Sequence, residues 1–380
     1  MTKSLFIPLQ LSLGTFVCLS ASPILAQVTS DGTVNTQVNE SGNISEITGG
    51  ETRGSNLFHS FQDFSVPTGN EAFFNNAESI SNIFSRVTGG NISNIDGLIR
   101  ANGSASLFLI NPAGIVFGEN ARLDIGGSFF GSTADSILFD GGEFSATDLT
   151  NPPLLTVNAP IGLNLRDNPG NITVRGDGNG IRLTDSEPVD TQDALRVNEN
   201  ATIGFLGGNV LFEDATVKTA GGRIEVGSVA DGTVGLVAVD NGLAFDYSGI
   251  DTFRDISLSG RSNIDASGVG GGDLQVAGNN ISIAGVSGLI SSTLGSTPGE
   301  DIKIFAAESI DISGVENEQD FISAISTRVL PVGTADAGNI NIETGSITIG
   351  DRAVINSSVS GQGNAGEVNI NATDSITIAS

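Results

Sequence analysis

His59 is the only imidazole in the sequence, and a serine or cysteine hydrolase would need it as the general base. It stands between Phe58 and Phe61, and the sequence contains no strand–turn–helix nucleophile elbow. The only cysteine, Cys18, lies in an apolar N-terminal run, so the rest of the chain has no thiol for catalysis, for a disulfide or for a zinc site. We therefore interpret His59 as a structural residue and predict that the protein is not an enzyme.

Three short patterns could each bind a ligand, but each has a simpler interpretation. Arg175-Gly176-Asp177 is an integrin-type tripeptide in a turn, and such tripeptides recur by chance. Asp177 and Asn179 could bind calcium, although the spacing fits neither an EF-hand loop nor a nine-residue calcium repeat. The glycine-rich stretch 268–272 is followed by no helix and no Lys-Ser/Thr pair, so it predicts no phosphate site. We expect surface turns at these positions, with no cofactor and no metal.

Paired carboxylates on a sheet surface could serve glycoside hydrolysis or lyase chemistry, and a β-helical polysaccharide-active enzyme is the alternative function. Composition argues against it because the side chains on which sugars stack are scarce: the chain has 20 Phe but one Tyr and no Trp. A groove lined by clustered carboxylates with a Lys or Arg would favour the enzyme. Scattered outward charges would count against it.

The overall charge limits the classes of partner. The formal net charge is −27 at pH 7, which repels nucleic acid and anionic membrane surfaces. Hydrophobic residues make up 38% of the chain, enough for a packed core. We expect a folded protein that binds no nucleic acid and whose acidic turns keep its surface soluble.

The N-terminal residues have the order of a secretory signal. Lys3 gives a short positive region, residues 5–19 are mostly apolar, and small residues lead to Ala26. This order predicts a cleavable signal peptide over residues 1–26 and Sec-type export. No other segment is long and apolar enough to span a membrane, so we expect no integral membrane segment in the mature chain.

Internal repetition is the strongest pattern after the signal peptide. Four segments begin with Gly and then alternate polar with apolar residues: 272–276, 299–304, 338–342 and 366–370. A second alternating strand follows each of them, and a short Ser/Ala-rich element lies between units. Three strands of about five residues with turns of about four make one triangular coil of about 27 residues, which predicts an all-β chain folded as a parallel β-helix. Period-two alternation places Ile and Val inside, and Gly and Asn at the corners are expected to supply positive φ.

Residues 50–140 differ from the repeats because they hold most of the phenylalanines. Phe58, Phe61 and Phe64 are spaced three residues apart and form an aromatic motif. The wider segment continues with short apolar strands that are separated by Gly- and Asn-containing turns.

A tight turn follows within the same region. An apolar strand ends at Asn111, and Asn111, Pro112 and Gly114 occupy the first, second and fourth positions that suit a type I turn. A second strand, 115–117, then departs. The pattern predicts a corner between two strands of one coil.

Behind a signal peptide, the aromatic motif and the Asn-Pro-x-Gly turn resemble the N-terminal secretion domain of the filamentous haemagglutinin family, the exported, TpsA-type partner of two-partner secretion. The resemblance covers about residues 30–160, and the downstream repeats also resemble family members. It implies a right-handed parallel β-helix, a solenoid whose N-terminal end is capped by the secretion domain. We accordingly predict a signal peptide at 1–26, a secretion domain at 27–160 and β-helix repeats at 161–380.

The resemblance also implies a function. In this family a TpsB-like outer-membrane pore protein recognises the N-terminal domain in the periplasm, and the chain crosses the pore unfolded and folds outside. This implies a secreted or cell-surface exoprotein that is adhesin-like, with a cell-surface or carbohydrate receptor. Asn111, Pro112 and Gly114, with Phe61 and Phe64 of the aromatic motif, would then serve folding and partner recognition.

Two features depart from the family pattern. Some relatives carry an Asn-Pro-Asn-Leu motif before the turn, whereas the corresponding stretch here, 89–95, has no Pro. Recognition that depends on that motif therefore has no support in this sequence. The chain also ends at Ser380 in the middle of a repeat and without an amphipathic cap, so we expect either a fragment or a missing cap.

Overall fold

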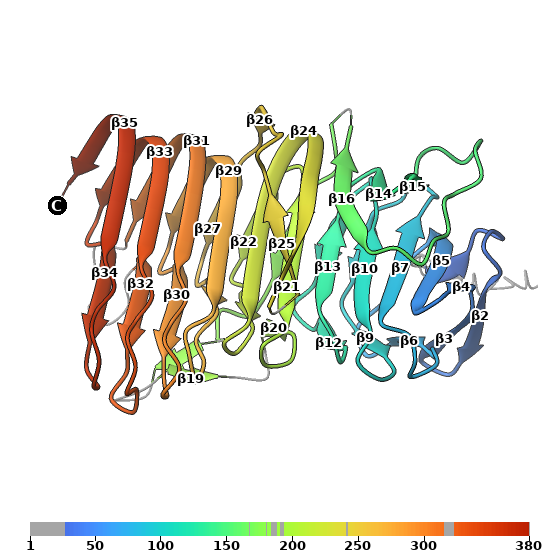
Figure 1. Cartoon of the computed structure of the whole chain (residues 1–380), viewed down its shortest axis with the longest axis horizontal. Coiled ribbons are helices and arrows are strands. Elements are labelled where there is room, and N and C mark those ends of the chain that lie inside the picture. Colours follow the sequence, from blue (N-terminus) through green and yellow to red (C-terminus); the bar gives the residue numbers. More distant parts are fainter. Residues whose placement is uncertain are drawn as a thin grey trace, which may run out of the picture.

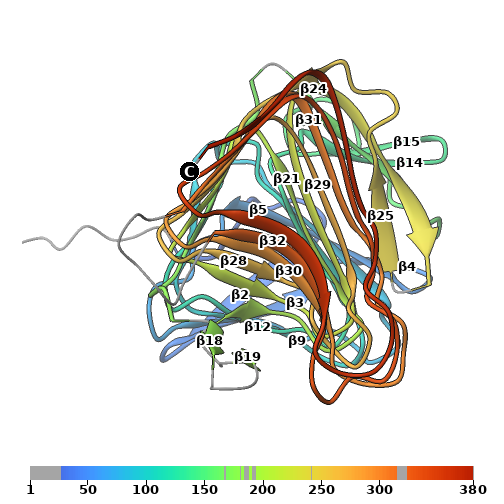
Figure 2. The same cartoon turned by 90° about the vertical axis from the view of Figure 1, so that its left-hand side faces the viewer.

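Strands from successive coils stack in parallel and form three faces around one long core (Figures 1 and 2). The computed structural model describes residues 27–379 except 167, 180, 184–187, 191–193, 241 and 315–322, so the predicted signal peptide lies outside the described residues. Every regular element in the described part is a β-strand, and none of it forms a helix that could cross a membrane. The predicted all-β parallel β-helix is therefore confirmed.

The first face is formed by β5 (Asn56–Asp63), β7 (Asn82–Val87), β10 (Ser106–Ile110), β13 (Phe129–Ser132), β21 (Thr202–Gly207) and the first part of β24 (Arg223–Val239). It continues with the first parts of β29 (Asp273–Ala284), β31 (Ile302–Ser313), β33 (Ile340–Gly350) and β35 (Val368–Ile378). The second parts of these four strands extend the second face, which begins with β8 (Ser93–Ile95), β11 (Ile115–Phe117), β17 (Ile172–Arg175), β22 (Val210–Glu213) and β27 (Ile256–Ser259).

The third face has two parts. Near the N-terminus it contains β3 (Ile44–Gly49), β6 (Glu71–Phe74), β9 (Leu98–Ala101) and β12 (Arg122–Asp124). Further along the solenoid it contains β20 (Leu195–Arg196), β23 (Thr216–Lys218), β28 (Asn263–Asp265), β30 (Gly288–Thr293), β32 (Ala324–Val329) and β34 (Val354–Val359). A short hairpin of β18 (Ile181–Leu183) and β19 (Pro188–Asp190) stands apart from both parts.

Columns of isoleucine build the interior of the later coils. Ile281, Ile310 and Ile347 are paired across three successive strands, and each is buried. The alternating residues face outward, as the period of two requires. The same strands turn the corner between the first and second faces at irregularities in their pairing, so no separate loop is needed there.

Short antiparallel strands close the N-terminal end. β1 (Thr29–Ser30) and β4 (Glu51–Arg53) pair antiparallel with β5, and β2 (Thr36–Ser41) pairs antiparallel with β3. These strands cover the first coil, whose core would otherwise face water. The N-terminal end of the solenoid is therefore capped.

An antiparallel layer lies outside the first face, as the view along the solenoid shows (Figure 2). It contains β14 (Ser136–Phe139), β15 (Gly142–Ser145), β16 (Pro160–Leu165), the second part of β24, β25 (Gly242–Asp246) and β26 (Thr252–Phe253). A second hydrophobic core is buried between this layer and the first face, separate from the interior of the coils. We call it the outer core.

Side-chain oxygens connect the corners of neighbouring coils. Asn171 Oδ1 accepts a hydrogen bond from the backbone N–H of Asn209 (3.0 Å), and Asn209 Oδ1 accepts one from Asp255 (3.2 Å). Asp255 Oδ1 accepts in turn from Asn280 (3.2 Å). The column satisfies backbone donors that the corners leave without sheet partners, which explains why Asn and Asp recur there.

The glycines that begin the repeats are needed for space, whereas positive φ is supplied, as predicted, at other corners, among them Gly260, Gly285 and Asn200. Gly272, Gly338 and Gly366 are absent from the residues with positive φ. A Cβ on Gly338 would lie 1.7 Å from the Glu300 carbonyl oxygen, and one on Gly366 would lie 2.0 Å from the Gly338 oxygen. Adjacent corners are packed backbone to backbone, and any side chain would separate them.

We expect Gly338→Ala to lower the free energy of unfolding by about 1–3 kcal/mol, because the coils at Gly338 and Glu300 must move apart. Gly350→Ala is the matched control, since a Cβ there meets nothing within 4 Å and its φ is not positive. Denaturant unfolding of both variants measures the difference. Equal stability of the two variants would contradict close packing as the reason for the repeat glycine.

Candidate functional site: the Asn-Pro-x-Gly corner and its surroundings

The Asn-Pro-x-Gly segment forms the corner between β10 and β11. The N–H of Gly114 donates to the carbonyl oxygen of Asn111 (3.0 Å), which closes a β-turn with Pro112 at its second position. Gly114 has φ +127°, a conformation that side-chain-bearing residues rarely adopt. Strand β11 starts directly after it, at Ile115.

The side chain of Asn111 is fully buried and fully hydrogen-bonded. Its Nδ2 donates to the carbonyl oxygen of Asn91 (2.9 Å) and to Ser93 Oγ (2.8 Å), both in the preceding coil. Its Oδ1 accepts from the N–H of Ala113 within the turn (3.0 Å). The amide therefore holds the turn in shape and joins it to the coil below.

The following coil holds the other side of the turn. The N–H of Gly170 donates to the Pro112 oxygen, and the N–H of Ile115 donates to the Asn171 oxygen, each at 3.0 Å. A Cβ on Gly170 would lie 2.5 Å from the backbone of Ala113, so only glycine allows this approach. The corner is thus connected to its neighbours on both sides. Sequence reasoning missed these partners because they lie far from the turn along the chain.

The aromatic motif is divided between two cores. Phe61 and Phe64 lie inside the coil, where their ring centroids are 5.2 Å apart and each is about 6 Å from Phe74. Phe58 lies on the other side of β5, in the outer core, with its ring 5.2 Å from that of Phe84. Period-two alternation along β5 puts Phe58 and Phe61 on opposite sides of the strand, whereas Phe64 lies beyond the end of β5 and packs inside the coil with Phe61.

The outer side of the first face carries a ladder of four phenylalanines. Phe58, Phe84, Phe108 and Phe130 are paired across successive strands. The rings of Phe84 and Phe108 are 5.0 Å apart, and those of Phe108 and Phe130 are stacked at 4.6 Å. The antiparallel layer covers this ladder, which explains how a region of large aromatic residues fits a thin solenoid.

Arg86 connects the cap, the first face and the antiparallel layer, and sequence reasoning did not find it. Its guanidinium is buried, donates to Ser60 Oγ (2.8 Å) and to the Ser145 carbonyl oxygen, and lies 4.6 Å from the centre of the Phe144 ring. Burial lowers the pKa of Arg86, and the nearby Asp31 carboxylate opposes that shift. A buried arginine with these partners fixes the position of the outer layer on the coil.

His59 lies in the interior of the first coil. Its Nδ1 is 3.2 Å from Thr36 Oγ1, and its ring is 6.0 Å from that of Phe61 and 5.6 Å from that of Phe74. Burial lowers the pKa of His59 from 6.5 to about 3, so the imidazole is neutral in the folded protein at neutral pH. These contacts agree with the interpretation of His59 as a structural residue.

His59 should make the protein less stable in acid. Below pH 6.5 the His59 imidazole is protonated in the unfolded chain but stays neutral in the folded chain until about pH 3. The free energy of unfolding therefore falls as the pH is lowered across that range. Glu225 acts in the opposite sense, because burial raises its pKa from 4.5 to about 7 and the folded state binds the proton first. Its contribution is present below about pH 4.5 and is lost as the pH rises through about 7.

We therefore expect His59→Gln to remove up to about 1.4 kcal/mol of acid destabilisation per pH unit between about pH 6.5 and 4.5. Denaturant unfolding at about pH 7 and about pH 5 measures this, and Glu225→Gln should shift the profile the other way. Parallel pH profiles of wild type and His59→Gln would show that His59 is not buried in the neutral form.

The structure places Arg175-Gly176-Asp177 at an exposed corner. Arg175 Nε donates to Glu213 Oε2 in the next coil (2.9 Å), and the N–H of Gly176 donates to the Glu213 carbonyl oxygen. Asp177 Oδ1 accepts from the N–H of Asn179 (2.8 Å), which is an ordinary Asx-turn. These three hydrogen bonds stabilise the turn and its contact with the next coil, as expected for a surface corner.

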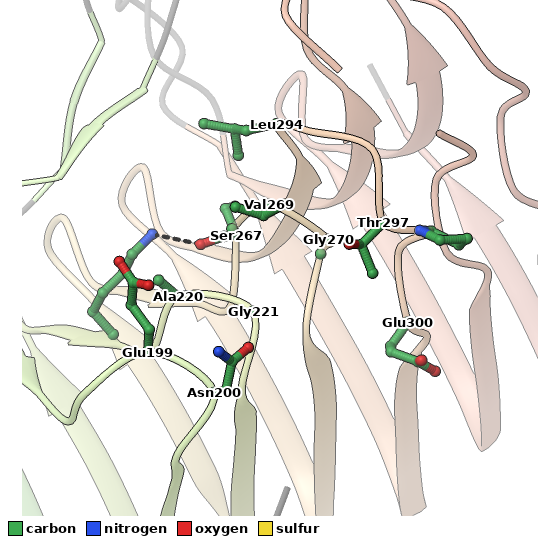
Figure 3. A pocket seen from close by; sticks show the side chains of 14 residues that line it. Glu199, Asn200, Ala220, Gly221, Ser267, Val269, Gly270, Leu294, Thr297 and Glu300 are labelled. Carbon is green, nitrogen blue, oxygen red and sulfur yellow. Dashed lines mark hydrogen bonds between the residues drawn. The ribbon is translucent and has the colours of Figure 1, made fainter. Parts of the chain in front are cut away.

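A recess of about 580 Å³ lies where the corners from the third face to the first differ in length. Residues 268–271 of the glycine-rich stretch line it, and so does Lys218, whose Nζ is 2.5 Å from Asp265 Oδ2 and 3.2 Å from the Ser267 oxygen. Figure 3 shows Glu199 and Glu300 at opposite sides of the recess. The ammonium group of Lys218 is thus paired with the Asp265 carboxylate.

These features define a capped parallel β-helix with an antiparallel outer layer and an interlocked Asn-Pro-x-Gly corner. The family model of the TPS secretion domain matches residues 26–276, which is more than half of the chain. The chain belongs to the TPS secretion domain family, whose members are the secretion domains of exoproteins exported by two-partner secretion.

Two solved structures are similar to the chain. The secretion domain of HMW1 from Haemophilus influenzae is 14% identical, with a TM-score of 0.46, and the match covers 93% of this chain and 98% of that one. The secretion domain of filamentous hemagglutinin is 16% identical, with a TM-score of 0.42, and the match covers 93% of this chain and all of that one. No curated protein matches the sequence.

The family match bears on organisation as well. It extends beyond residue 160 and includes the whole antiparallel outer layer. A domain of this family implies an outer-membrane TpsB transporter as the general partner. The boundary that we placed at residue 160 stays a prediction, as do the roles assigned to Asn111, Pro112 and Gly114.

Proposed function

We propose that this chain is an exoprotein that reaches the cell surface or the medium by two-partner secretion. Sec-type export would precede recognition of its N-terminal domain, residues 27–160, by a TpsB-like outer-membrane pore protein. The observation that carries the proposal is the family match over residues 26–276. The interlocked Asn-Pro-x-Gly corner within that region supports it further.

Burial of the motif residues supports recognition before folding. Asn111, Phe61 and Phe64 are at most 1% exposed, so a partner cannot contact them on the folded domain. In the folded protein these residues stabilise the coils. If the pore protein recognises these residues, it must bind them in the unfolded chain. They would then become buried when the chain folds outside the cell. Folding outside would also prevent return through the pore.

An adhesin-like role with a cell-surface or carbohydrate receptor fits the outward surface better than an enzymatic role. The chain presents an acidic solenoid, and its only imidazole lies in the coil interior. The alternative, a polysaccharide-active enzyme, would have to act at the recess beside Lys218 or at the hollow lined by Asp96, Glu119, Arg175, Glu213 and Asp214. In both places the cation is already paired with a carboxylate, Lys218 with Asp265 and Arg175 with Glu213, which counts against that alternative.

The test is the export of residues 1–380 from cells with and without the cognate pore protein, measured by immunoblotting of the medium and the cell surface. We expect export only when the pore protein is present. Equal amounts in the medium without the pore protein would overturn the proposal. Release of reducing ends from polysaccharides by the purified chain would favour the enzyme instead.

A further inference from the structure

The outer side of the first face changes along the solenoid. One column of paired residues begins with the four phenylalanines, and continues beyond β24 as Gln275, Lys303 and Asn341. The antiparallel layer covers the aromatic part and ends with β25 and β26. The outward side chains of the first face therefore change from apolar to polar where the antiparallel layer ends. The edge of that layer stands above the uncovered part of the face and forms a step.

A pocket of about 410 Å³ lies at this step. Five outward side chains of the first face line it, Gln275, Lys303, Phe305, Asn341 and Glu343, and Tyr247 reaches it from the end of β25. The register places Gln275, Lys303 and Asn341 in one row across three strands, and Phe305 and Glu343 in the next row. A volume of this size is within the range of small-ligand sites.

Aromatic rings form one wall of the pocket. The Phe305 ring is 5.2 Å from that of Phe253, and the Phe253 ring is 6.0 Å from that of Tyr247. Phe305 is 39% exposed, which is unusual for a phenylalanine on a sheet that is otherwise polar at this end. The exposed ring offers a flat apolar surface next to polar side chains.

Two buried polar atoms beside the pocket have no partner among the described residues. They are Tyr247 Oη and Glu225 Oε2. Burial raises the pKa of Tyr247 well above its usual value, and its hydroxyl is covered by protein, so the ring rather than the hydroxyl faces the pocket. Gln275 Nε2 is already held by the Phe245 carbonyl oxygen (2.9 Å), which leaves the side-chain oxygen of Gln275 as an acceptor.

We propose that this pocket binds a sugar unit of a neutral glycan. Each sugar hydroxyl both donates and accepts, and the pocket offers Lys303 as a donor and Glu343 and the side-chain oxygen of Gln275 as acceptors. The apolar face of a pyranose ring can pack on the exposed ring of Phe305. The aromatic wall matches the apolar face of a sugar ring, and the row of polar side chains matches its hydroxyl groups.

Other ligand classes fit less well. A peptide strand needs a free sheet edge, whereas β29, β31 and β33 are each paired on both sides at the pocket. A polyanion would be repelled by Glu343 and by the net charge of −27. A simple cation would face Lys303. The inference rests on the proposed adhesive role and gives it a surface, but export does not depend on it.

The sequence provides its own reporter for the test. Tyr247 is the only tyrosine and the chain has no tryptophan, so tyrosine fluorescence reports on this pocket alone. The full secreted chain is titrated with galactose, mannose, N-acetylglucosamine and lactose. We expect a saturable change with at least one of them, weakened at least about tenfold by Phe305→Leu and kept by Val332→Ala. Val332 is a matched control because it is 52% exposed at a corner away from the pocket.

Three results would overturn the proposal. They are no saturable change with any of the four sugars, a change that Phe305→Leu leaves intact, and an equal change with phosphate or ethanolamine. Export of Phe305→Leu is measured in parallel and should match the wild type. Normal export without sugar binding would remove the glycan site and leave the secretion function standing, whereas pore-independent export would remove the secretion function alone.

Discussion

Replacing Asn111 with Ala is expected to lower the free energy of unfolding by about 2–4 kcal/mol and to reduce pore-dependent export. The substitution removes three hydrogen bonds, two of them to the preceding coil. It leaves the buried Ser93 hydroxyl and the half-buried Ala113 N–H without that partner. Asn111→Asp should cost at least as much, because a carboxylate cannot donate to the Asn91 oxygen.

Denaturant unfolding and the export assay are compared on the same variants. Ile347→Ala is the matched control: Ile347 is fully buried in β33, outside residues 26–276, and its truncation should cost about 2–5 kcal/mol. If Asn111→Ala exports less than Ile347→Ala at equal stability, the turn serves export directly. Equal losses would mean that stability alone governs export, and unchanged stability of Asn111→Ala would contradict the hydrogen-bonding role.

The strands of the later coils could be predicted because each carries its own alternation. Ile281, Ile310 and Ile347 repeat within near-identical segments, and burial of one face follows directly from the period of two. The Asn-Pro-x-Gly turn could be predicted for a similar reason, since the preferences of a β-turn are local. Local rules were sufficient wherever one coil resembles the next.

The outer layer could not be predicted, because it depends on pairings between distant residues. Leu163 pairs with Ile137 on one side and with Val234 on the other, and neither pairing follows from the local sequence pattern. The same limit applies to the aromatic motif. The assignment of Phe58 to the outer core and of Phe61 to the interior requires the register of β5, which spacing alone does not determine.

Replacing Phe108 with Ala is expected to lower the free energy of unfolding by about 3–5 kcal/mol, the largest effect of a single substitution that we predict. Phe108 lies between Phe84 and Phe130 and is 1% exposed, although it lies outside the coil. Its removal would open a cavity between two rings and beneath the antiparallel layer. Denaturant unfolding measures the loss.

Two variants test whether the outer core contributes to the stability of the protein. Phe108→Leu keeps most of the apolar volume and should cost clearly less, whereas Phe305→Ala removes an exposed ring at the uncovered end of the same face and should cost under about 1 kcal/mol. A small loss for Phe108→Ala would mean that the antiparallel layer can detach at little cost. A large loss means that this region folds as one unit with two cores, because the coil and its outer layer then share the same stabilising contacts.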